Sequence, residues 1–192
     1  MFFRSIPDKQ QAQVILDQQA KRSYSYDDVG MTAGSPPARY VVDHNRIQIG
    51  SGAGAFDAAC DAMRQWQMFG MGWIDLLWPN APLVEGTVVG VVAQLPGLSV
   101  FNVCRIVYVI DEISDEMTRF GFAYGTLPGH VERGEERFLI EWRYSDDTVW
   151  YDILAFSRPN HWLVRLGYPV TRLYQKCFAR ASLQCMVEVC QA

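Results

Sequence analysis

The chain has 192 residues, 49% of them hydrophobic, and a formal net charge of −4 at pH 7. This length predicts one domain, and the apolar share is sufficient for one substantial core. The acidic balance and the lack of a basic cluster argue against a nucleic-acid-binding protein, and no apolar run reaches the ~20 residues that span a bilayer.

The first 23 residues predict an N-terminal helical extension, followed by a single domain over residues 24–192. Within the extension, Pro7–Ala20 is expected to form a short helix, and the polar start is not typical of a signal peptide. Two Gly and two Pro between Tyr24 and Tyr40 indicate an extended covering segment or a loop. Val41–Val42 and Arg46–Ile49 then have the composition of a strand.

Apolar residues at helical spacing predict an amphipathic helix, which Gly70 and Gly72 are expected to end. Its apolar positions are Phe56, Ala59, Cys60, Met63 and Trp66. The preceding stretch Gly50–Ala55 superficially resembles a dinucleotide-binding fingerprint. Because the following strands read as an antiparallel meander and not as βαβ units, a tight strand-to-helix turn is the favoured interpretation.

An apolar segment, Trp73–Trp78, separates this helix from the next strands. We expect it to form a wall or a lid of a cavity. The alternative is a contact with a membrane surface, which is not favoured because the segment has no neighbouring Lys or Arg.

The pattern then changes to strands separated by Pro-Gly, Ser-Asp and Asp-Asp breaks. The predicted strands are Gly86–Leu95, Val100–Glu112, Thr118–Leu127, Glu135–Tyr144 and Thr148–Arg158. Their short connections make neighbouring strands antiparallel. A final helix follows Pro159, is interrupted at Gly167 and Pro169, and is expected to cover the sheet with an apolar stripe of Leu166, Val170, Leu173, Tyr174, Cys177, Phe178 and Ala181. This order predicts an α+β helix-grip fold, a curved antiparallel sheet wrapped on a long C-terminal helix around a cavity.

The register of the last three strands predicts which side chains face that cavity. A two-residue turn at Asp146-Asp147 would pair Ser145 with Thr148, and a long loop would pair Leu127 with Glu135. One face then becomes apolar with a polar end, and we expect it to bind a ligand through Phe122, Tyr124, Thr126, Glu136, Phe138, Trp142, Tyr151 and Ser157. Glu135 would turn to the other face and form a cross-strand ion pair with Arg158.

Glu136 and His130 are the candidate catalytic residues. A carboxylate at the end of an apolar cavity has a raised pKa unless donors or a cation offset its desolvation, so Glu136 can act as a general acid or base or anchor a ligand hydroxyl or amine. The alternative is that Glu136 caps the Pro128–Gly134 loop by accepting its backbone N–H groups. For His130 the alternative is a loop histidine exposed to water.

Neither metal nor cofactor is predicted. The five cysteines are scattered without a C-x-x-C pair, which argues against a zinc knuckle or a redox dithiol. We expect buried free thiols in a reducing, cytoplasmic protein. The three histidines lie far apart, without the spacing of metal ligands.

Several segments together form a family pattern: Tyr26, Val29-Gly30, Thr32, Gly50-x-Gly52 with Phe56, Trp66, Gly121–His130, Gly134-Glu-Glu-x-Phe138 and Phe156–Pro159. In these segments the chain resembles the uncharacterised protein family zero-five-four-eight, a domain of unknown function in bacteria and plants, from about Tyr24 to Ala181. The resemblance implies kinship with the Bet v 1-like and START-like helix-grip superfamily. It implies no established activity and no catalytic residues. Members of that superfamily bind sterols, lipids, hormones or polyketides, and a minority catalyse cyclisation or hydration.

The leading expectation is a protein that binds a hydrophobic or amphipathic small molecule, lipid-, sterol- or polyketide-like, in an internal cavity. The second hypothesis is an enzyme of the cyclase or hydrolase type, with Glu136 or His130 as acid/base and Tyr124 as a hydrogen-bond donor. The third is a structural or interaction module, peripheral to a membrane through Trp73–Trp78. No nucleic-acid partner is expected, membrane contact is not favoured, and the oligomeric state is left open.

Overall fold

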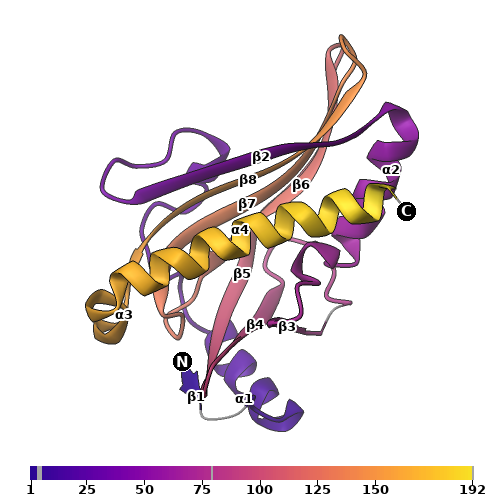
Figure 1. Ribbon diagram of the computed structural model, residues 1–192. Helices are drawn as coiled ribbons and strands as arrows, with labels where there is room; N and C mark the ends of the chain where they lie inside the picture. The colour runs from indigo at the N-terminus through magenta and orange to yellow at the C-terminus, as the bar shows by residue number, and fades with distance from the viewer. Residues whose placement is uncertain (4–5, 79, 192) are drawn as a thin grey trace.

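The computed structural model describes residues 1–3, 6–78 and 80–191 of the chain. A curved antiparallel sheet in the order β2-β8-β7-β6-β5-β4-β3 has the long C-terminal helix lying across its concave face (Figure 1). The predicted helix-grip fold is therefore confirmed. The strands are β1 (Phe2–Phe3), β2 (Val41–Ser51), β3 (Ile74–Leu77), β4 (Val88–Leu95), β5 (Leu98–Ile113), β6 (Met117–Thr126), β7 (Glu132–Arg143) and β8 (Thr148–Pro159). The helices are α1 (Lys9–Ala20), η1 (Met31–Ala33), α2 (Gly52–Arg64), η2 (Gln67–Phe69), α3 (Trp162–Leu166) and α4 (Tyr168–Gln191).

The hairpin between β7 and β8 differs from the predicted one by two residues. Phe138 pairs with Ile153 instead of Ala155, and across the other hairpin Glu136 pairs with Tyr124 instead of Thr126. Of the two turn residues, only Asp147 has a positive φ, 56°, whereas the predicted type I′ turn needs two. Because side chains alternate along a strand, a shift of two residues leaves every side chain on its predicted face.

Helix α2 ends earlier than the glycines predict. Trp66 adopts a left-handed conformation with φ 57°, which buries its ring to 2% exposure, and its Nε1 donates to the Ala81 carbonyl at 2.8 Å. At the start of α2, Gly52 has φ 77°, and a Cβ on Gly50 would lie 2.7 Å from the Ala55 Cβ. These glycines therefore serve a tight strand-to-helix turn.

Helix α4 is rotated relative to the predicted stripe. Leu166, just before it, and Val170 and Leu173 within it are 78%, 58% and 61% exposed, whereas Ser182 and Met186 are fully buried. Polar contacts with the sheet help to set this rotation, and a prediction from apolar residues alone does not include them. One such contact is the hydrogen bond between the Ser182 and Tyr151 hydroxyls, which lie 3.0 Å apart. The prediction that the full stripe covers the sheet is therefore wrong for its N-terminal half.

The convex face of the sheet is covered by segments from the first 40 residues of the chain. Helix α1 packs Ala12 and Leu16 against Phe101 and Leu127, and β1 pairs with β5. The segment between Tyr24 and Tyr40, irregular except for η1, covers β7 and β8 through a buried cluster of Tyr26, Tyr40 and Phe156. The main core lies on the opposite, concave face, beneath α2, η2 and α4.

Candidate functional site

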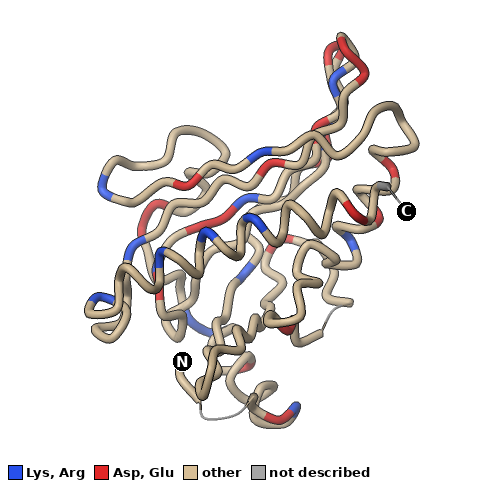
Figure 2. Tube along the Cα trace, viewed as in Figure 1, with Lys and Arg blue, Asp and Glu red and all other residues tan. Residues whose placement is uncertain are grey.

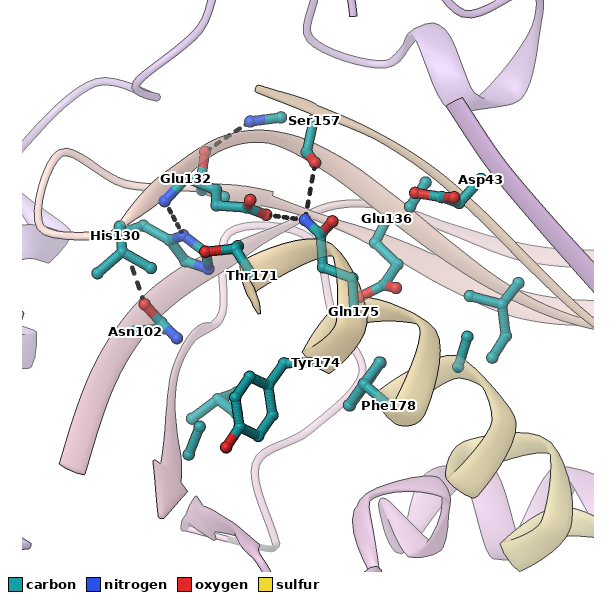
Figure 3. Close-up of a pocket in the computed structure, with 18 of the residues that line it drawn as sticks. Asp43, Asn102, His130, Glu132, Glu136, Ser157, Thr171, Tyr174, Gln175 and Phe178 are labelled. Atoms are coloured by element: carbon teal, nitrogen blue, oxygen red, sulfur yellow. Dashed lines mark hydrogen bonds between the residues drawn. The ribbon is translucent and has the colours of Figure 1, made fainter. Parts of the chain in front are cut away.

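A pocket of about 740 Å³ lies between the concave face of the sheet and α4. This volume is within the range of about 300–1,000 Å³ that is usual for small-molecule sites. Apolar side chains form much of its wall, among them Phe69, Trp73, Ile74, Val91, Val100, Cys104 and Phe178. Polar side chains gather at one end, where β6, β7, β8 and α4 meet: Thr126, His130, Glu132, Glu136, Ser157 and Gln175. Figure 3 labels all of these except Thr126.

The predicted polar residues and the predicted aromatic residues lie in different places. Tyr124, Thr126, Glu136 and Ser157 line the pocket, as does His130. The four others are not among the lining residues, because α2, η2 and α4 fill that part of the concave face. Phe122 and Phe138 pack beneath Trp66 and Phe69, Trp142 packs against Phe56, and the Tyr151 hydroxyl meets Ser182. The predicted cavity is thus larger than the pocket in the structure.

Glu136 stands half-buried in the pocket wall. Its Oε2 accepts a hydrogen bond from the Tyr124 hydroxyl at 2.7 Å. Burial raises the pKa of the Glu136 carboxyl to about 7, and the neighbouring carboxylates of Glu132 and Asp43 act in the same direction, while the Tyr124 bond opposes them. Glu136 therefore exchanges a proton near neutral pH.

The Pro128–Gly134 loop takes its caps from other residues, so the capping alternative for Glu136 is wrong. The Gly134 N–H donates to Thr126 Oγ1 at 3.0 Å, and the Val131 N–H donates to Asn102 Oδ1 at 3.4 Å. The carboxylate of Glu136 remains on the pocket side, with the Tyr124 hydroxyl as its donor.

The His130 side chain forms a hydrogen bond within the same loop. Its Nδ1 accepts the Glu132 N–H at 3.0 Å, and the side chain is half-buried instead of exposed to water. Burial, reinforced by the charge of the N-terminal ammonium, lowers the pKa of His130 to about 3. The ring is therefore neutral with its proton on Nε2, which makes it a hydrogen-bond donor to the pocket and a poor base.

Glu132 is a site residue that the sequence does not predict, because the predicted strand begins only at Glu135. Its Oε2 accepts from Gln175 Nε2, and the same nitrogen lies 3.2 Å from Ser157 Oγ (Figure 3). Burial raises the pKa of the Glu132 carboxyl above its usual range, opposed by the Gln175 and Ser157 contacts. If the predicted strand had begun at Glu132, side-chain alternation would have placed Glu132 on the same face as Glu136, because the two residues are an even number of positions apart.

Asp43 is a second unpredicted residue, at the β2 side of the pocket. Both of its oxygens accept from the Arg172 guanidinium, at 2.6 Å each. This two-point contact ties α4 to the edge strand β2 and offsets part of the Asp43 charge.

Glu135 turns to the convex face, where the predicted ion pair with Arg158 is wrong. The two-residue shift in register places Phe156 opposite Glu135, and Arg158 lies over the Tyr40 ring. The Glu135 carboxylate accepts from the Tyr26 hydroxyl at 2.6 Å and, in the covering segment, from the N–H groups of Gly30 and Thr32 at 2.7 and 2.9 Å and from the Thr32 hydroxyl. It therefore fastens the covering segment to the sheet.

Three general features bear on the kind of site that this part of the chain can form. Within residues 1–3, 6–78 and 80–191, no group of three or more His, Cys, Asp and Glu side chains is arranged to hold a metal ion. No helix in that same part of the chain is long and apolar enough to cross a membrane. The thiols of Cys60 and Cys104 are free and buried, Cys177 is exposed, and Cys185 and Cys190 are partly exposed.

Comparison with known proteins identifies the family. The family description "Domain of unknown function (DUF1990)" matches residues 25–185. A UPF0548 protein of Dictyostelium discoideum is 39% identical over 158 residues, which cover 79% of this chain and 73% of the relative. The chain belongs to the UPF0548 family. A UPF0548 protein of Deinococcus radiodurans is 32% identical over 201 residues and covers 97% of this chain, with 98% of its own length matched.

Solved structures resemble this UPF0548 chain at low sequence identity. A hypothetical protein of Helicobacter pylori is 12% identical with a TM-score of 0.46, covering 86% of this chain and 95% of its own. Human STARD10 is 12% identical with a TM-score of 0.42, and the match covers 97% of this chain and 81% of the STARD10 chain. Ara h 8.0201 is 13% identical with a TM-score of 0.43, and the match covers 77% of this chain and 99% of the Ara h 8.0201 chain. Likenesses of this strength carry no conclusion about a ligand or a reaction.

Several of the segments behind the UPF0548 resemblance lie around the polar end of the pocket, on both faces of the sheet, whereas Phe56 and Trp66 pack elsewhere, against Trp142 and Phe122. Gly121–His130 forms most of β6 and its following loop, and Gly134–Phe138 lies in β7. Tyr26 reaches the sheet at Gly125, where a Cβ would lie only 2.1 Å from the Tyr26 hydroxyl. Residues of the family pattern thus form contacts between the covering segment and the central strands, and they contribute to the pocket wall.

Proposed function

We propose that this UPF0548 protein binds an amphipathic small molecule in the pocket between the sheet and α4. The apolar body of the ligand would pack against Phe69, Trp73 and Phe178, and its polar end would meet Glu136 and Ser157. The observation that carries the proposal is a pocket of about 740 Å³ whose polar groups gather at one end. Such asymmetry suits a ligand that is apolar over most of its length and polar at one end. The free cysteines, of which only Cys60 and Cys104 are buried, are consistent with a cytoplasmic setting.

Filling the pocket tests the proposal. Ala93 lines the apolar wall and is partly buried, so Ala93→Phe would occupy space that the ligand needs. We expect the affinity for the neutral fluorescent probe N-phenyl-1-naphthylamine to fall at least about tenfold, because the displaced probe loses apolar burial. The matched control is Ile113→Phe, at a side chain that is 80% exposed on the β5–β6 hairpin. Equal probe affinity in both variants, or no binding by the unaltered protein, would refute the proposal.

A second candidate is an enzyme that uses Glu136 as its acid/base. The observation in its favour is a pocket carboxyl whose pKa is raised to about 7, close to the optimum for proton transfer at neutral pH. Tyr124 would act as its hydrogen-bond partner. His130 is not retained as a base, since its low pKa and its occupied Nδ1 leave it little basicity. Release of a chemically altered product from a bound ligand, lost in Glu136→Gln, would distinguish catalysis from binding.

A further inference from the structure

We infer that the polar end of the ligand is a cation of the protonated-amine class, held between Glu132 and Glu136. The inference rests on the proposed function and specifies the chemistry of its ligand. It follows from an unsatisfied carboxylate oxygen, from the charges around it, and from the position of the basic side chains.

Glu132 has a buried oxygen without a partner. The residue is only 8% exposed, and among the described residues its Oε1 has no hydrogen-bond donor, while Oε2 is held by Gln175. An unsatisfied buried acceptor destabilises the folded protein, and more so when it is charged. A ligand that donates a hydrogen bond at this end of the pocket would remove that destabilisation.

Above about pH 7 both carboxyls can carry charge, and no described cation forms an ion pair with either of them; the charge of Arg172 also reaches Glu132, but its ion pair is with Asp43. Asp43 is paired with Arg172, but Glu136 has a hydroxyl donor and Glu132 an amide donor. A neutral alcohol would satisfy an oxygen and leave this charge in place. An ammonium group would supply both donors and opposite charge, whereas a carboxylate or phosphate would be repelled.

The groups that face this pair from the surrounding elements are otherwise neutral. They are the Cys104 thiol from β5, the Tyr124 hydroxyl from β6, the neutral His130 ring from the loop, Ser157 from β8, and Tyr174 and Gln175 from α4. His44 of β2 is bound to Asp152, at 2.6 Å. The remaining cations of the lining, Lys176 and Arg180, are exposed side chains of α4. Figure 2 shows Lys and Arg residues following one another along α4. Of these, Arg172 is held by Asp43.

Three probes with one apolar chain and different heads test the inference: decylamine, decanol and decanoic acid, each measured by displacement of N-phenyl-1-naphthylamine at pH 8. We expect decylamine to bind at least about tenfold more tightly than decanol, and decanoic acid to bind most weakly. This preference is measured on the unaltered protein, so the result does not depend on whether a variant folds. Decylamine binding no tighter than decanol would overturn the inference and leave the proposed function standing. Failure of all probes would overturn the proposed function itself.

Two substitutions localise the effect. Glu132→Gln and Glu136→Gln should each weaken decylamine binding at least about tenfold while changing decanol binding less than about threefold. Glu116→Gln, at an exposed residue before β6, is the matched control and should change neither. If Glu132→Gln and Glu136→Gln both keep the full preference for the amine, as the control does, the cation is not held between Glu132 and Glu136.

The pH profile gives an independent readout. The affinity for decylamine should rise about tenfold between pH 5.5 and pH 8, because Glu136, with a pKa of about 7, becomes charged while an alkyl ammonium stays protonated. The affinity for decanol should stay nearly constant. A flat decylamine profile in the unaltered protein would contradict the pairing with Glu136.

Discussion

At the scale of single residues, two adjacent glutamates have opposite roles. Glu135 accepts four hydrogen bonds on the convex face, while Glu136 faces the pocket with the Tyr124 hydroxyl as its donor. Their alternation could be predicted from sequence, because neighbouring residues of a strand point to opposite faces. Their partners could not, since Tyr26 and Thr32 lie more than 100 residues away in the chain.

The pKa of Glu136 predicts a pH dependence of stability. Between its ordinary value of 4.5 and about 7 in the folded state, the folded protein binds more protons than the unfolded chain. The free energy of unfolding should therefore fall as pH rises through this window, by up to about 3 kcal/mol for the full shift. Glu132, whose pKa is also raised, acts in the same direction.

Glu136→Gln should remove most of that dependence. Urea unfolding at pH 5 and pH 8 is expected to show a smaller loss of stability in the variant than in the unaltered protein, and a variant that is the more stable of the two at pH 8. Glu116→Gln, at an exposed site, should retain the original profile. An unchanged profile in Glu136→Gln would mean that Glu136 titrates as an ordinary surface carboxyl.

At the scale of elements, α4 shows how polar anchors can decide which face of a helix is buried. Apolar spacing predicts that Leu173 faces the sheet, yet Leu173 is 61% exposed and Met186 is fully buried. The two-point contact of Arg172 with Asp43 and the Gln175 contacts require these polar side chains to point inward. A prediction from periodicity uses only the positions of apolar residues, so it cannot include hydrogen bonds from the helix to side chains on other strands.

Two substitutions in α4 should therefore have unequal effects. Met186→Ala should lower the free energy of unfolding by about 2–5 kcal/mol, because it leaves a cavity in the core. Leu173→Ala should change it by less than about 0.5 kcal/mol, as expected for an exposed position. Both free energies are read from urea unfolding. Similar losses in the two variants would show that the exposed stripe is covered in solution.

At the scale of the whole molecule, the N-terminal extension is part of the packed structure. Leu16 of α1 is 6% exposed and packs with Phe101, Val103 and Leu127 behind the sheet, whereas Val14 on the same helix is 50% exposed. The sequence predicts the helix but not its docking site, because β4 and β5 lie some 80 residues further on.

Leu16→Ala is thus expected to cost about 2–4 kcal/mol of stability, and Val14→Ala close to none. Thermal unfolding monitored by circular dichroism would measure both. If Leu16→Ala is neutral, α1 does not contribute to the stability of the domain.

Local patterns in the sequence were sufficient to predict the main helices, the five strands between residues 86 and 158, the antiparallel order of these strands and the faces of the central ones. Alternation of apolar residues and short turns act over a few positions, and an error of two residues in register leaves the faces unchanged. The tertiary structure alone decided where the pocket ends, because α2, η2 and α4 fill the part of the concave face occupied by Phe122, Phe138, Trp142 and Tyr151. It also decided that Glu132 joins Glu136 at the polar end, through a contact with Gln175 across 43 positions of the chain.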